Sequence, residues 1–139
     1  MSGSVKVDLN PDNPHSPERT AELAHVAAEA VRVLNHATMP GRGGLAYPSD
    51  VCAVLSSLHE LVRRIPQLCD QLGNWLAAEN DAGRVRTDEP GGVVPIAVIK
   101  AHLATVAIEA GMLGHVLDEV HGRCASLAYA DPHELRDGS

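Results

Sequence analysis

The sequence predicts an all-α fold, an antiparallel bundle of three long helices. Apolar residues recur with heptad spacing along two long segments, which is typical of helices that pack side by side. They make up 45% of the 139 residues, enough for a globular core. The chain has no Phe, and its aromatic residues are Tyr47, Trp75 and Tyr129, so Ala, Val and Leu must fill that core. Such a core suits closely packed helices better than a β-sandwich.

The first helix is expected from 17 to 38. Ser16 suits the N-cap position and Pro17 the first helical position. Its apolar residues at helical spacing are Leu23, Val26, Ala27, Ala30, Val31 and Leu34. The preceding residues 1–15 are predicted to be a flexible arm, although weak alternation of apolar residues also allows a strip that docks on the bundle or on a partner.

The second helix is expected from 48 to 79, after a glycine-rich linker. Three apolar rows run along it: Val51, Leu58, Ile65 and Leu72; Val54, Leu61, Leu68 and Trp75; and Leu55, Val62, Cys69 and Leu76. Pro66 is unfavourable inside a helix by about 3 kcal/mol. Because the heptad register is the same on both sides of Pro66, and Pro66 falls on the face away from the three rows, the sequence favours one helix kinked at Pro66 over two shorter helices, which would give four segments.

The third helix is expected from 95 to 128, after a polar loop rich in Gly and Pro. Its apolar residues alternate in spacings of three and four: Ile99, Leu103, Val106, Ala110, Leu113, Leu117, Val120, Cys124 and Leu127. Gly111 and Gly114 each cost about 1 kcal/mol in a helix interior, which suggests that another helix or a ligand approaches closely there. Residues 16–129 are therefore predicted to form a single bundle domain, followed by a disordered tail at 130–139.

The three helices are unequal in length. At 1.5 Å per residue the first spans about 33 Å and the other two about 48 Å each. The apolar rows of the second and third helices continue beyond the length that the first helix can cover. Exposed apolar surface of this extent usually marks an interface. The residues expected at this interface are Ile65, Leu68, Leu72, Trp75, Leu76, Ile99 and Leu103. The sequence thus predicts a homodimer or a docked partner helix, unless the arm folds back over the surface.

Charge and composition exclude several classes of protein. The formal net charge of −7 disfavours a nucleic-acid partner or a membrane surface. No continuous apolar run reaches the roughly 20 residues of a membrane span, and the N-terminus has no apolar signal segment. The three widely spaced cysteines do not imply disulfides, so a cytoplasmic location is expected. The preference for Arg over Lys, with much Ala, Gly and Val, is typical of GC-rich bacteria such as actinomycetes.

Eight histidines raise the question of a metal site. Glu22 with His25 and Asp118 with His121 have the i, i+3 spacing that resembles ferritin-like di-metal bundles. Both histidines lie beside the apolar rows rather than on them, so these residues are expected on solvated faces and no metal or other cofactor is predicted. Nucleophilic catalysis has no support either, because no cysteine or serine has a matching base, orienting group and cleft.

The sequence therefore predicts a non-enzymatic interaction module that works through its apolar rows. The alternative is a small-molecule or metal-binding bundle with its site near Gly111, Gly114 and the helix histidines.

Overall fold

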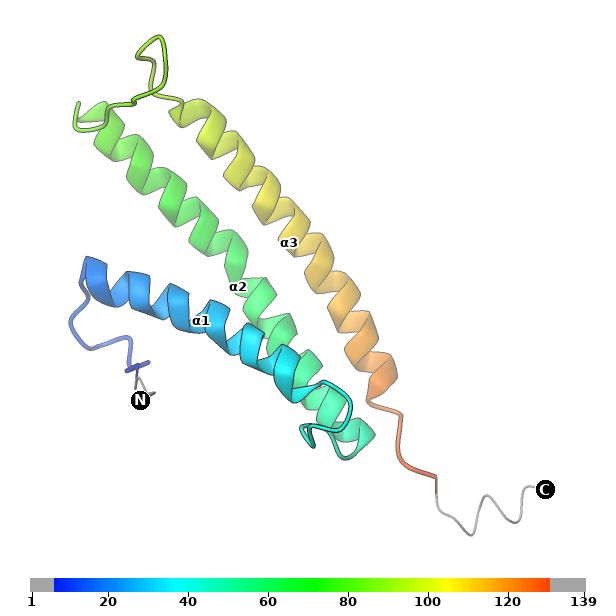
Figure 1. Ribbon diagram of the computed structural model, residues 1–139. Helices are drawn as coiled ribbons and strands as arrows, with labels where there is room; N and C mark the ends of the chain where they lie inside the picture. The colour runs from blue at the N-terminus through cyan, green and yellow to red at the C-terminus, as the bar shows by residue number, and fades with distance from the viewer. Residues whose placement is uncertain (1–6, 131–139) are drawn as a thin grey trace. The chain divides into compact units, whose positions relative to one another are not determined.

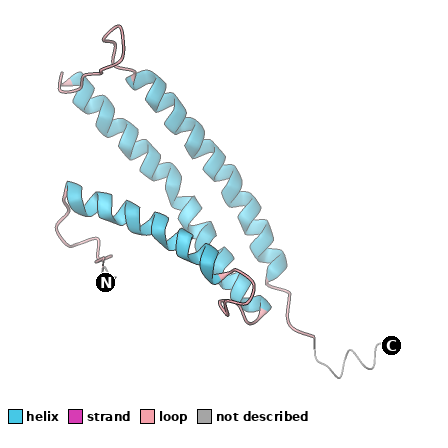
Figure 2. Ribbon diagram, viewed as in Figure 1, coloured by secondary structure: helices cyan, strands magenta, loops and turns pink. Residues whose placement is uncertain are grey.

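The computed structural model describes residues 7–130, which form three helices and no strand (Figures 1 and 2). The helices are α1 (Pro17–Ala37), α2 (Pro48–Asp81) and α3 (Ile96–Cys124). The predicted all-α fold is confirmed. The chain divides into two compact units, Met1–Ala46 and Tyr47–Ser139. Residues 1–6 of the predicted arm and 131–139 of the predicted tail lie outside the described residues.

The first unit is built around the start of α1. The Ser16 hydroxyl accepts a hydrogen bond from the Arg19 N–H at 3.0 Å, which confirms the predicted N-cap. The Arg19 guanidinium in turn donates to the backbone carbonyls of Asp8 at 3.0 Å and Asn10 at 2.8 Å. One arginine therefore ties residues 8–14 to the helix, in the segment predicted as a flexible arm.

Helix α2 runs without interruption through Pro66, as predicted (Figure 2). Its start is fixed by Asp50, whose carboxylate accepts a hydrogen bond from the Tyr47 N–H at 2.8 Å. The expected position of Pro66 is wrong, however. Pro66 is half-buried and borders a groove with residues of α3, so it lies on the side of α2 that faces α3.

The second unit is an antiparallel hairpin of α2 and α3, joined by residues 82–95 (Figure 1). Buried and half-buried residues recur at spacings of three and four along both helices and form what we call the α2–α3 seam. On α2 these are Cys52, Leu55, His59, Val62, Pro66, Cys69, Gly73, Leu76 and Asn80, and on α3 Ile96, Ile99, Leu103, Ala107, Ala110, Gly114, Leu117, His121 and Cys124. Several of these positions hold glycine or alanine, and at Gly73 the side chains of Lys100 and Leu103 pack against the α2 backbone.

About half of the α3 residues that were predicted to contact α2 lie in the seam. Val106, Leu113 and Val120 were expected in the seam, but they are 46%, 50% and 42% exposed. Their places are taken by smaller or more polar neighbours, Ala107, Gly114 and His121. At each of these three places the predicted and the observed seam residue are neighbours in the chain, so they lie about 100° apart around the helix. Hydrophobicity alone favours the valines and leucine over the residues that pack.

Helix α3 also ends four residues earlier than expected, at Cys124. The Ser126 hydroxyl donates to the carbonyl of Arg123 at 2.9 Å, and so satisfies one of the carbonyls left free at the helix end. Leu127, predicted in the seam, consequently lies beyond the helix and is exposed.

Substituting two helical glycines by leucine tests this packing. A Cβ atom on Gly73 would lie 3.4 Å from Leu103 Cδ1, whereas one on Gly111 would meet nothing within 4 Å. Both changes gain helix propensity of up to about 1 kcal/mol, but only Gly73→Leu overpacks the seam, at about 1–3 kcal/mol. Urea unfolding followed by circular dichroism should show Gly73→Leu less stable than wild type and Gly111→Leu as stable or more so. Equal effects would contradict the seam.

Candidate functional site

The α2–α3 seam uses only part of the apolar surface of α2. Of the three predicted rows, the one through Leu55 and Leu76 packs against α3. Residues of the other two rows remain exposed within the hairpin: Leu68 and Leu72 are each 49% exposed and Trp75 is 64% exposed. Of the other predicted interface residues, Ile65, Leu76, Ile99 and Leu103 are half-buried. Leu76, Ile99 and Leu103 belong to the seam itself.

Helix α3 extends this surface on the same side of the hairpin. Most seam residues come in pairs three positions apart, such as Cys52 with Leu55 and Ala107 with Ala110, and the residue just before each pair lies on one flank of the seam. In an antiparallel helix pair, these flanking residues of the two helices lie beside one another. These positions hold Val51, Leu58, Ile65 and Leu72 on α2 and Val106, Leu113 and Val120 on α3. With the outer row Val54, Leu61, Leu68 and Trp75, they make up what we call the apolar face of the hairpin.

Helix α3 as a whole is unusually apolar for a helix with so little burial. By length and composition alone it could cross a membrane, whereas the sequence was expected to contain no such segment. Only 6% of its most apolar 18-residue window is buried. A core helix of a soluble protein passes the same test because it is buried, and that explanation does not apply within this hairpin.

The opposite side of the hairpin carries an open groove of about 430 Å³. It is lined by His59, Arg63 and Pro66 of α2 and by Ala110, Gly111, Gly114, His115 and Asp118 of α3. The expected close approach to Gly111 and Gly114 is not found among the described residues, because a Cβ atom on either would meet nothing within 4 Å. The two glycines instead leave space that the groove occupies.

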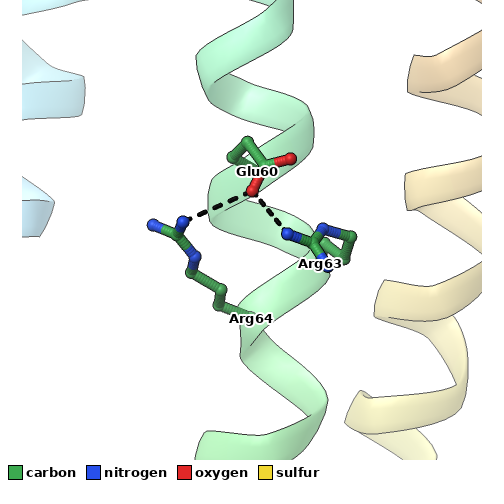
Figure 3. A network of polar contacts seen from close by, with 3 residues as sticks. All are labelled: Glu60, Arg63 and Arg64. Atoms are coloured by element: carbon green, nitrogen blue, oxygen red, sulfur yellow. Dashed lines mark hydrogen bonds and ion pairs between the residues drawn. The ribbon is translucent and has the colours of Figure 1, made fainter.

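Arg63, which lines the groove, belongs to a network of ion pairs on α2 (Figure 3). Glu60 accepts hydrogen bonds from Arg63 at 2.7 Å and from Arg64 at 3.4 Å. The bond from Arg63 is the main reason why the pKa of Glu60 is lowered from its ordinary value. Glu60 is a carboxylate that is ionised at neutral pH even at its ordinary pKa, and its ion pair with Arg63 lies beside the groove.

The low-ranking metal candidates are not brought together within one unit. Glu22 and His25 belong to α1 in the first unit. Asp118 borders the groove, and His121 is half-buried in the seam rather than beside it. Among residues 7–130 no group of three or more His, Cys, Asp or Glu residues is placed to hold a metal ion.

A pair of cysteines meets at the open end of the hairpin, which sequence reasoning missed. The Sγ atoms of Cys52 and Cys124 lie 2.8 Å apart, although the residues are 72 positions apart in the chain. Gly73 faces Leu103, and three heptads back along α2 and forward along α3 from there lie Cys52 and Cys124. The pair was therefore within reach of sequence analysis only once the register of the two helices was known.

Comparison of the chain with protein-family models, curated proteins and solved structures found no match. The apolar face, the groove and the cysteine pair are therefore the features of the molecule that bear on its function.

The hydrogen bond to Cys124 is the main reason why the pKa of the Cys52 thiol is raised, with burial second. A raised pKa leaves less thiolate at neutral pH and slows alkylation. In a Cys69→Ala background, we expect Cys124→Ala to speed alkylation of Cys52 by iodoacetamide at pH 7.5 by threefold or more, as followed by mass spectrometry. The two rates should converge at a pH where both thiols are ionised. Equal rates at pH 7.5 would contradict the assigned cause.

Proposed function

We propose that the protein is a non-enzymatic helical interaction module that self-associates through the apolar face of its α2–α3 hairpin. The observation that carries the proposal is the width and continuity of this face, to which both helices contribute. Large exposed apolar patches on soluble proteins are typical of association sites.

The composition of the face supports its burial against a protein partner rather than its exposure to solvent. The two exposed rows of α2 between Val51 and Trp75 contain no charged residue. On α3, Val106, Leu113 and Val120 continue the surface, and polar residues such as Glu109 lie at its margin. An apolar centre with charges at the rim is the usual composition of a protein–protein interface.

Size favours a second copy of the hairpin as the occupant. With 29 residues, α3 is about 44 Å long, and two helices side by side are about 20 Å wide. The resulting area is close to the roughly 800 Å² per partner of a stable interface. A 21-residue helix such as α1 is about 32 Å long and would leave part of the face uncovered. Two hairpins related by a two-fold axis would close a four-helix bundle in which each protects the other.

Matched aspartate substitutions test this proposal. Leu72→Asp and Leu113→Asp each place a charge on the apolar face, and the two-fold axis buries it twice. Burial of an unpaired charge costs several kcal/mol, so we expect dimerisation to weaken at least 100-fold. Ile108→Asp is the control, because Ile108 is also an exposed apolar residue of α3, at 66%, but follows the seam residue Ala107 and so lies on the groove side. Analytical ultracentrifugation over a concentration series measures all three.

The wild-type mass decides the proposal. A dimer that Leu72→Asp and Leu113→Asp dissociate, and that Ile108→Asp leaves intact, supports it. A wild-type monomer at concentrations of tens of micromolar overturns it. Flotation of the wild-type protein with neutral phosphatidylcholine vesicles, lost in Leu113→Asp, would instead assign the face to a membrane and would equally overturn self-association.

A second candidate function is the binding of a small ligand in the groove. It is favoured by one observation: the groove lies where Gly111 and Gly114 leave space beside His59, His115 and Arg63. The guanidinium and two imidazoles outnumber the one carboxylate in the lining, that of Asp118, and with the apolar walls they suit a small anionic, partly apolar molecule.

The anionic dye 8-anilinonaphthalene-1-sulfonate is a suitable probe for this groove. We expect saturable fluorescence enhancement that Gly111→Leu, which fills the groove, reduces at least tenfold in affinity. Leu72→Asp, on the other side of the hairpin, should bind the dye as wild type does. The reverse pattern would show that the dye binds the apolar face, and ligand binding in the groove would lose its support.

A further inference from the structure

We propose that Cys52 and Cys124 form a reversible intramolecular disulfide that clasps the open end of the α2–α3 hairpin. The proposal does not depend on self-association, because the pair lies in the seam and not on the apolar face.

The geometry already brings the two sulfur atoms almost to bonding distance. They are 2.8 Å apart, and a covalent S–S bond is about 2.05 Å long, so closure requires a movement of less than about 1 Å. Cys124 is the last residue of α3 and Cys52 lies in the first turns of α2, so each sits near a helix end. Helix ends have the freedom for so small an adjustment.

Access to the pair is asymmetric. Cys124 is buried, with Pro48 O 3.9 Å from its sulfur, whereas Cys52 is half-buried and reachable from solvent. An external disulfide therefore meets Cys52 first, and Cys124 is already in place as the resolving thiol. Cys69, the third cysteine, is buried and lies 17 residues further along the same helix, or about 26 Å from Cys52. It cannot compete for either partner while α2 is intact.

The oxidant is a small-molecule disulfide of the glutathione type. The Cys52 thiolate attacks one of its sulfur atoms, forms a mixed disulfide and releases one thiolate. The Cys124 thiolate then attacks the Cys52 sulfur and releases the second. The two protons lost by the cysteines end on the two released thiols, so one small disulfide becomes two small thiols and the protein dithiol becomes a disulfide.

The link would act at the end of the hairpin where no loop joins the two helices. Residues 82–95 join the helices at one end, and at the other the described contacts between them include the cysteine pair and an edge-to-face contact of Tyr47 and Tyr129, with ring centroids 5.6 Å apart. The cross-link closes a chain segment of 72 residues, and long segments gain most from such closure. With the disulfide formed, the two helices are covalently connected at both ends of the hairpin instead of only at the 82–95 loop.

The experiment uses the full-length chain under native conditions. The reduced protein is equilibrated with about 1 mM each of reduced and oxidised glutathione, conditions in which we expect more than about nine-tenths of it to reach the Cys52–Cys124 disulfide. Alkylation with N-ethylmaleimide after denaturation should then add one group, at Cys69, instead of three, and non-reducing peptide mapping identifies the linked pair. The oxidised protein should unfold at a temperature higher by roughly 10 °C or more, and dithiothreitol should reverse this shift.

Three variants make the result specific. Cys69→Ser should retain the disulfide and the thermal shift, while Cys52→Ser and Cys124→Ser should lose both and unfold at the temperature of the reduced wild type. Three outcomes overturn the proposal: a stable glutathione adduct on Cys52, a disulfide between two chains, or formation of the disulfide only in denaturant. Formation of the disulfide only in denaturant would show that the folded hairpin holds the two sulfur atoms too rigidly to form the bond.

Discussion

The close approach of α2 and α3 through small side chains is the constraint on which the rest of the hairpin depends. Gly73 lets the Leu103 side chain lie against the α2 backbone, and the small residues Ala110 and Gly114 are buried positions of α3 in the same seam. This contact fixes both the rotation and the register of the helices. The rotation sends the larger apolar residues to one side and opens the groove on the other, and the register places Cys52 opposite Cys124.

Features that depend on local chemistry could be predicted from the sequence. The start of α1 follows from the ability of Ser16 to cap a free N–H, and the start of α2 from Pro48. The continuity of α2 through Pro66 followed from an unbroken heptad pattern, because a reversing loop rarely preserves register. Each of these signals lies within a single helix, so no knowledge of the partner helix is needed.

The remaining features depend on which faces meet, and hydrophobicity misleads there. Val106, Leu113 and Val120 score as better core residues than Ala107, Gly114 and His121, yet the smaller or more polar residues are the ones that lie in the seam. Packing rewards fit as well as apolar area, and fit depends on the opposite helix. The same limit applies to the candidate sites. The apolar face was foreseen in part, through Leu68, Leu72 and Trp75, whereas the cysteine pair required the register.

The antiparallel register also orders the contacts of the hairpin by the length of chain that each one closes. Contacts next to the 82–95 loop join residues that are close in the sequence, so they cost little chain entropy. Contacts further from the loop close longer segments, up to the 72 positions between Cys52 and Cys124, and cost more. A bond between those residues would consequently capture only chains that have completed the whole hairpin, and would separate them from chains still open.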